Sequence, residues 1–214
     1  MKTMKLPAII LTFLFCCRCS AQELPLPIQL PKPDTTGGKP LMQVLKERRT
    51  SRTFSTEKLS PQILSNLLWA AFGINRPDGH RTAPSAMNWQ EIDIYVALGE
   101  GLFRYDAPSH SLLPILGEDI RGKTGTKEFV KDAPANLVYV ADYAKAQRGS
   151  QEDKNLYSGA DCGFIAENVY LCCSSEGLAC VVRGSVDRAL LGITMKLRPE
   201  QKIILTQSVG HFIK

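Results

Sequence analysis

The chain has 214 residues, of which 44% are hydrophobic, and a formal net charge of +5 at pH 7. This length and composition suit one globular domain with a sizeable hydrophobic core. Three of the positive charges lie in a predicted leader, so the mature chain carries about +2. Because this charge is small and no basic stripe or nucleic-acid motif is present, nucleic acid is not an expected partner.

The first 21 residues are typical of a secretory signal peptide. Lys2 and Lys5 precede an apolar run over residues 6–15, and small residues follow up to the predicted cleavage site before Gln22. The apolar run is too short for a transmembrane helix, so we expect export to the periplasm without a membrane span. An N-terminal lipid anchor stays open as the alternative, because cysteines lie near the cleavage site. They are Cys16, Cys17 and Cys19.

Residues 22–40 are rich in proline and end near a Gly-Gly pair, which predicts an extended tether ahead of the domain. The folded domain is then expected over residues 41–214.

Four cysteines follow the leader, and in an exported chain they could form two disulfides. Cys162, Cys172 and Cys173 lie on one predicted helix, where neighbours cannot easily bridge. We therefore interpret these three and Cys180 as small core residues. These four cysteines form no C-x-x-C pair, so a structural metal site is not expected.

Helical and strand patterns alternate along the domain, so the predicted fold class is α+β. Apolar spacing predicts a helix over 41–49, and Ser60 before Pro61 predicts the start of another that ends at Gly73. A short helix is expected over 186–191. A central sheet is predicted from strands at 92–96, 102–105, 112–116, 136–140, 178–182 and 202–206.

Residues 159–173 are apolar or small at most positions, which leaves too narrow a polar face for a surface helix. We therefore predict a long central helix that is buried on nearly all sides, in part across a subunit interface. The alternative is a core helix of a monomer. Glu176 and Gly177 end this helix, and backbone N–H groups at such a turn are expected to be free for a ligand.

Two polar segments are candidates for ligand binding. Arg48, Arg49 and Arg52 fall within five residues and indicate an anion site, although a solvated surface cluster is the alternative. The loop over residues 75–88 is long enough to suggest a function, and Ser85 and Asn88 offer hydrogen bonds to a polar heterocycle.

In their order and spacing, four short motifs resemble the FMN-dependent nitroreductase family. They are residues 48–52 (RRTSR), 84–88 (PSAMN), 175–179 (SEGLA) and 208–211 (SVGH). The resemblance covers about residues 41–214. It implies an α+β domain with a central mixed or antiparallel sheet. It also implies an obligate homodimer, formed through long central helices, with an FMN at each of two interface sites.

The resemblance also implies roles for individual residues, and all of them bind cofactor. Arg48, Arg49 and Thr50 match the phosphate motif, with Lys214 as a further phosphate ligand, and Arg52 matches the cation near the flavin pyrimidine. The backbone N–H groups of Glu176 and Gly177 match the turn that faces flavin N5 and O4. No catalytic side chain and no metal is implied, because the flavin carries the chemistry. Residues along the ribityl chain and ring edge are Pro84, Ser85, Ala86 and Asn88.

The implied activity is a two-step transfer of hydride or electrons through bound FMN to a small organic acceptor, such as a nitroaromatic or a quinone. NADH or NADPH is a possible donor, although nicotinamides are scarce outside the cytoplasm. The alternative is an exported, non-catalytic module that binds an anion or a flavin on its tether.

Overall fold

The computed structural model describes residues 24–213. The predicted leader and Lys214 lie outside the described residues. No helix among residues 24–213 combines the length and the hydrophobicity needed to cross a bilayer.

A seven-stranded sheet forms the centre of the domain, and every neighbouring pair of its strands is antiparallel. The sheet order is β1-β4-β3-β2-β5-β7-β6. The predicted α+β class is confirmed, and each predicted strand is present. The strands are β1 (Ile28–Gln29), β2 (Ile92–Leu98), β3 (Gly101–Asp106), β4 (Ser111–Leu116), β5 (Ala135–Asp142), β6 (Ala179–Arg183) and β7 (Gln201–Gly210).

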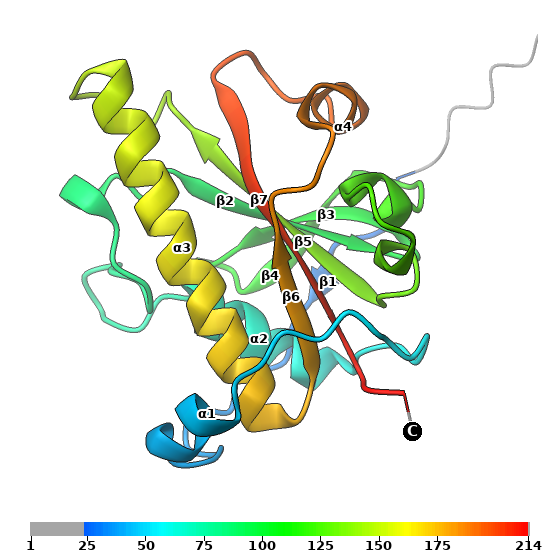
Figure 1. The fold of residues 1–214 in the computed structure, drawn as a ribbon. Helices are drawn as coiled ribbons and strands as arrows, with labels where there is room; N and C mark the ends of the chain where they lie inside the picture. The colour runs from blue at the N-terminus through cyan, green and yellow to red at the C-terminus, as the bar shows by residue number, and fades with distance from the viewer. Residues whose placement is uncertain (1–23, 214) are drawn as a thin grey trace, which may run out of the picture.

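The helices divide between the two faces of the sheet (Figure 1). The long helix α3 (Gln151–Glu176) and α2 (Pro61–Phe72) share one face, and the short α4 (Arg188–Thr194) covers the other. Helix α1 (Leu41–Glu47) packs near the C-terminal end of α3. The α4 helix begins at Arg188, two residues later than predicted, because the Asp187 side chain caps it by accepting the Leu190 N–H at 3.0 Å.

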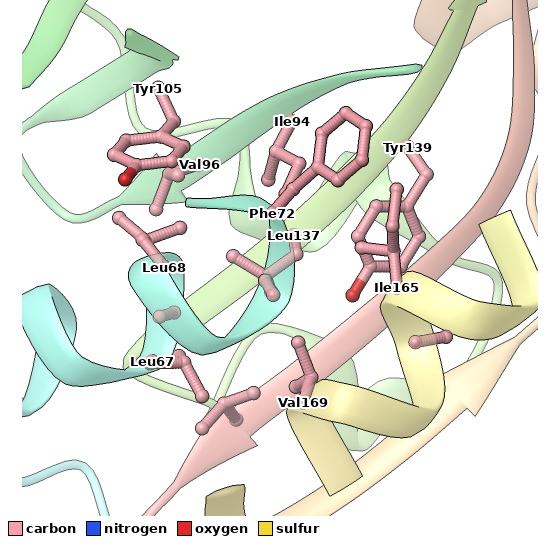
Figure 2. Close-up of a cluster of buried hydrophobic side chains, with 14 of the residues drawn as sticks. Leu67, Leu68, Phe72, Ile94, Val96, Tyr105, Leu137, Tyr139, Ile165 and Val169 are labelled. Atoms are coloured by element: carbon pink, nitrogen blue, oxygen red, sulfur yellow. The ribbon is translucent and has the colours of Figure 1, made fainter. Parts of the chain in front are cut away.

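The main core lies between the sheet and the α2–α3 layer (Figure 2). Leu67 and Leu68 from α2 and Ile165 and Val169 from α3 are fully buried against this face. Every residue of β5 is buried because helices or short turns cover both sides of it. This burial explains why residues 137–141 of β5 form a continuous apolar run rather than an alternating one.

The α2 helix follows its local sequence signals. Ser60 caps it, with Oγ accepting the Ile63 N–H at 3.2 Å, and Pro61 occupies its first position. Gly73 is the C-cap residue, as predicted.

Helix α3 is longer than the apolar pattern indicated. It begins eight residues before position 159, at a capping box in which Ser150 Oγ accepts the Asp153 N–H and the Asp153 carboxylate accepts the Ser150 N–H. The first turns were missed because residues 151–157 are mostly polar.

Removing this cap should weaken the fold measurably. We expect Ser150→Ala to lower the free energy of unfolding by about 1 kcal/mol, because the Asp153 N–H loses its partner at the start of the helix. Urea denaturation tests this, with the exposed neighbour Gln151→Ala as control. Equal stability of the two variants would contradict the role of the cap.

The prediction that α3 is buried on nearly all sides is wrong for the single chain. One face packs on the sheet, but the opposite face exposes Leu156 by 64% and Phe164 by 48%. Gly159, Ala160 and Gly163 are exposed beside them. The sequence pattern shows that this helix face is apolar. It cannot show whether the same chain or a second chain buries that face.

The described part of the predicted tether, residues 24–40, is part of the folded domain. Its strand β1 pairs with β4, and Leu30 is buried in the main core. Side chains of α2 hold its backbone, since Ser65 Oγ donates to the Pro31 carbonyl at 2.6 Å and Asn66 Oδ1 accepts the Asp34 N–H at 2.9 Å. Proline-rich composition predicts an extended backbone but cannot distinguish a free segment from a docked one.

His110, in the turn between β3 and β4, supports this docking. Its Nε2 lies 2.7 Å from Ser65 Oγ and its Nδ1 lies 2.9 Å from the Tyr105 hydroxyl. The Ser65 proton is directed at Pro31, so the neutral ring donates from Nε2 to Ser65 and accepts at Nδ1 from Tyr105. Burial lowers the pKa of His110 below its usual 6.5.

This histidine should give the protein an acid-sensitive component of stability. Because its pKa is lower in the folded state, its contribution is complete above pH 6.5 and is lost as the pH falls below that value. Urea denaturation between pH 5 and pH 8 should show this loss, and His110→Gln, which does not titrate, should show less of it. Identical pH profiles for the two proteins would contradict this role.

Candidate anion-binding site

A cavity of about 530 Å³ lies where the end of α1, the end of α3 and the start of β6 meet. Four cations line it, against one carboxylate from Glu47. Glu47 accepts a hydrogen bond from Lys39 at 2.7 Å, which lowers the pKa of its carboxyl. The cavity therefore keeps an excess of positive charge. Its cations are Lys39, Lys46, Arg48 and Arg49.

The two arginines stack on aromatic rings. The guanidinium carbon of Arg48 lies 5.3 Å from the centre of the Tyr170 ring, and that of Arg49 lies 5.1 Å from the Phe212 ring. Within residues 24–213, neither arginine forms an ion pair with a carboxylate. Stacking fixes the planes of these groups and leaves their N–H donors available for an anion.

Backbone and hydroxyl contacts hold this arginine segment in place. The Ser51 N–H donates to the Cys180 carbonyl at 2.9 Å, and Thr50 Oγ1 lies 3.1 Å from the Tyr170 hydroxyl. The same hydroxyl accepts the Val182 N–H at 2.9 Å. Tyr170 thus links α3, β6 and the arginine segment, a role that its position within an apolar helix does not reveal.

Gly177 also lines this cavity, but its backbone does not match the expectation. It adopts a left-handed conformation with φ of 70°, which favours glycine. Its N–H donates to the Cys173 carbonyl, and the Leu178 N–H donates to the same oxygen at 2.8 Å. The prediction of free N–H groups at this turn is wrong for Gly177, because the helix end uses its amide as a cap.

Glu176 faces a second cavity, of about 720 Å³, which lies between α3, α2 and residues 34–44. The two cavities share Lys39. Arg52 is exposed and, like Thr50, does not contribute to the lining of the basic cavity. The structure therefore brings Arg48, Arg49 and Gly177 together, with Thr50 attached through Tyr170.

The segment over residues 84–88 lies elsewhere, beside the first half of α3. The Ala86 N–H donates to the Asp161 carboxylate at 2.8 Å, and burial raises the pKa of Asp161. Ser85 Oγ accepts the Gln90 N–H at 2.8 Å. Pro84 and Asn88 are exposed.

The backbone of this segment is strained. Met87, Asn88 and Gln90 have φ values of 50°, 51° and 49°, which non-glycine residues adopt infrequently. Strain of this kind costs free energy and concentrates at binding sites, so its occurrence here supports a functional role.

Asp161 and Gly177 are sixteen positions apart on α3, which corresponds to about 24 Å along the axis. Within one chain, residues 84–88 and the basic cavity therefore lie far apart.

In the last motif, residues 208–210 form the end of β7, and His211 follows directly. Val209 pairs with Cys180, and the following Phe212 reaches the cavity. Ser208 is buried and accepts a hydrogen bond from Arg183 Nη2 at 3.1 Å. This motif supports the cavity floor through β6.

Comparisons with known proteins agree on one family. Residues 45–211 match the model described as "Nitroreductase family". A protein of Methanocaldococcus jannaschii that is named as a nitroreductase is 31% identical over 155 residues, which cover 68% of this chain and 78% of that protein.

Solved structures give the same result. One from Ralstonia eutropha, also named as a nitroreductase, is 43% identical with a TM-score of 0.84 and covers 88% of this chain and 90% of its own. A second, from Desulfovibrio desulfuricans, was solved in complex with FMN. It is 18% identical with a TM-score of 0.61 and covers 83% of this chain and 89% of its own, so it has the same fold.

Proposed function

Because the chain belongs to the nitroreductase family, an oxidoreductase family, we propose that it is an FMN-dependent oxidoreductase acting on a small organic acceptor. The observation that carries this proposal is the basic cavity, in which Arg48 and Arg49 present unpaired guanidinium groups. The FMN complex of the Desulfovibrio relative supports the choice of cofactor.

The cavity suits the phosphate end of such a cofactor. Guanidinium forks match phosphate oxygens, and the unpaired positive charge favours a dianion. Arg48 and Arg49 would hold the phosphate, with Thr50 beside them and Lys39 and Lys46 adding to the field. Lys214 remains a proposed further phosphate ligand.

A homodimer would complete the site. The exposed face of α3 carries small and apolar residues, and a Cβ atom added at Gly159 or Gly163 meets nothing within 4 Å. Two-fold packing of this face with the two α3 helices antiparallel would place the first half of one α3 beside the second half of the other. The partner's strained segment 84–88 would then approach the half of α3 that bears Tyr170. We propose that Pro84, Ser85, Ala86 and Asn88 act on the cofactor across this interface.

Bound FMN would supply the capacity to accept and pass on a hydride or electrons. The described side chains would bind and orient it, and the positive charge of Arg52 would favour an anionic reduced ring. We also propose roles for the backbone of Glu176 and Gly177, although the Gly177 N–H would first have to leave Cys173. NADH or NADPH is the proposed donor.

The composition of residues 1–21 supports export as a further proposal. Mass spectrometry of the mature protein should find Gln22 at the N-terminus. A lipid-modified cysteine would instead indicate an anchor, and an intact Met1 would contradict export.

Flavin binding by the full-length protein tests the proposed cofactor. Titration into FMN and into riboflavin should quench flavin fluorescence, with FMN bound at least about tenfold more tightly because only FMN carries the phosphate. No binding of either would favour the non-catalytic module, and equal binding of both would contradict the phosphate assignment.

A further inference from the structure

Two cysteines meet beneath the basic cavity. Cys173 lies in the last turn of α3 and Cys180 lies in β6, and the reversal of the chain at Gly177 places them side by side. The Cys180 thiol lies close enough to influence that of Cys173, and both residues line the cavity although they are only 1% and 2% exposed.

Hydrogen bonds converge on the sulfur of Cys180. Gln207 Nε2 donates to Cys180 Sγ at 3.0 Å and also to the Ala166 carbonyl at 3.2 Å, while the Tyr139 hydroxyl donates to Gln207 Oε1. These contacts fix the amide with its N–H groups toward the sulfur. The amide thus holds Cys180 Sγ in a fixed position in the cavity wall.

The thiol of Cys173 is affected mainly by burial. Burial, and then its hydrogen bond to Cys180, raise the pKa of the Cys173 thiol well above its usual value. The Cys173 thiol is therefore protonated at neutral pH. We accordingly assign the first attack to Cys180 and the second to Cys173.

We propose that Cys173 and Cys180 form a redox-active dithiol, which a small-molecule disulfide oxidises to an intramolecular disulfide at the floor of the cavity. Three observations support this proposal. The two thiols lie close together, both line the cavity, and Gln207 donates a hydrogen bond to Cys180 Sγ. The cations in the cavity would attract an anionic oxidant such as glutathione disulfide.

The reaction has two exchange steps. Cys180 thiolate attacks one sulfur of glutathione disulfide, whose S–S bond breaks and releases one glutathione thiolate. Cys173 then loses its proton and attacks Cys180 Sγ, which forms the protein disulfide and releases the second glutathione thiolate. The protein gives up two electrons and two protons, and the oxidant becomes two molecules of glutathione.

The other two cysteines differ in position. Cys162 is fully buried and lines neither cavity near the end of α3. Cys172 faces the neighbouring cavity instead. Cys172 is thus a matched control, since it adjoins Cys173 in sequence and points elsewhere.

Peptide mapping tests the proposal directly. Full-length protein is incubated with glutathione disulfide, alkylated and digested with trypsin and a protease that cuts after glutamate. Cleavage after Glu176 separates the partners, so the disulfide should join peptide 168–176 to peptide 177–183. Cys172→Ser should keep this link, and Cys173→Ser and Cys180→Ser should each abolish it.

The rate of oxidation supplies a second readout that needs no variant. Because the thiolate is the attacking form of a cysteine, the rate of oxidation should rise as the pH is raised from pH 7 to pH 9. Persistence of the link in Cys173→Ser, or formation of the link only in urea-unfolded protein, would overturn the proposal.

Discussion

Replacing Gly163 with arginine should convert the protein to monomers and weaken FMN binding by at least about 100-fold. The site faces open space in the single chain, so the substitution should leave the fold of the protomer intact. In the proposed dimer, the same arginine would place an unpaired charge and a large volume between two α3 helices. The cost of burying such a charge, several kcal/mol, exceeds the amount needed for this change in affinity.

Sedimentation velocity and FMN titration of the full-length variant measure the two effects separately. Gly192→Arg is the matched control, because Gly192 also lies in a helix and also faces open space, but on α4. Dimers that survive Gly163→Arg would contradict the proposed interface. If the variant is monomeric but binds FMN as tightly as the original protein, the assignment of the interface would stand, and the proposal that both protomers share the FMN site would be contradicted.

Arg48→Ala should lower FMN affinity by one to two orders of magnitude while leaving the free energy of unfolding nearly unchanged. A charged hydrogen bond contributes about 1.5 to 3 kcal/mol, which corresponds to this range. The side chain stacks on Tyr170 and has no carboxylate partner within residues 24–213, so its removal leaves no buried charge behind.

Riboflavin provides the control for this variant. Because riboflavin has no phosphate, its affinity should change by less than about threefold in Arg48→Ala. The exposed Arg148→Ala should affect neither ligand. An equal loss of FMN and riboflavin affinity would show that Arg48 supports the cavity rather than the phosphate.

Local signals predicted much of the fold. The Ser60-Pro61 start, the Gly73 stop and the alternating strands all depend on neighbouring residues and are confirmed. The N-terminal segment could not be placed, because its docking depends on α2 side chains more than 20 residues away.

The candidate site shows the same division between local and distant contacts. Arg48 and Arg49 were predicted as a candidate anion site because their spacing alone concentrates charge. Tyr170 and Phe212 were not identified, since an aromatic residue in an apolar run gives no sign that an arginine stacks on it. The exposed face of α3 was predicted as buried because its residues look alike whichever chain covers them.

The measurement that tests the central claim most directly is the visible absorbance of the purified full-length protein with FMN under anaerobic conditions. Addition of NADH or NADPH should bleach the bound-flavin spectrum, and a nitroaromatic or a quinone should then restore it. Bound flavin that bleaches with dithionite but with neither nicotinamide would overturn the proposed donor. A bleached spectrum that neither acceptor restores, or the absence of bound flavin at any FMN concentration, would contradict the proposed oxidoreductase.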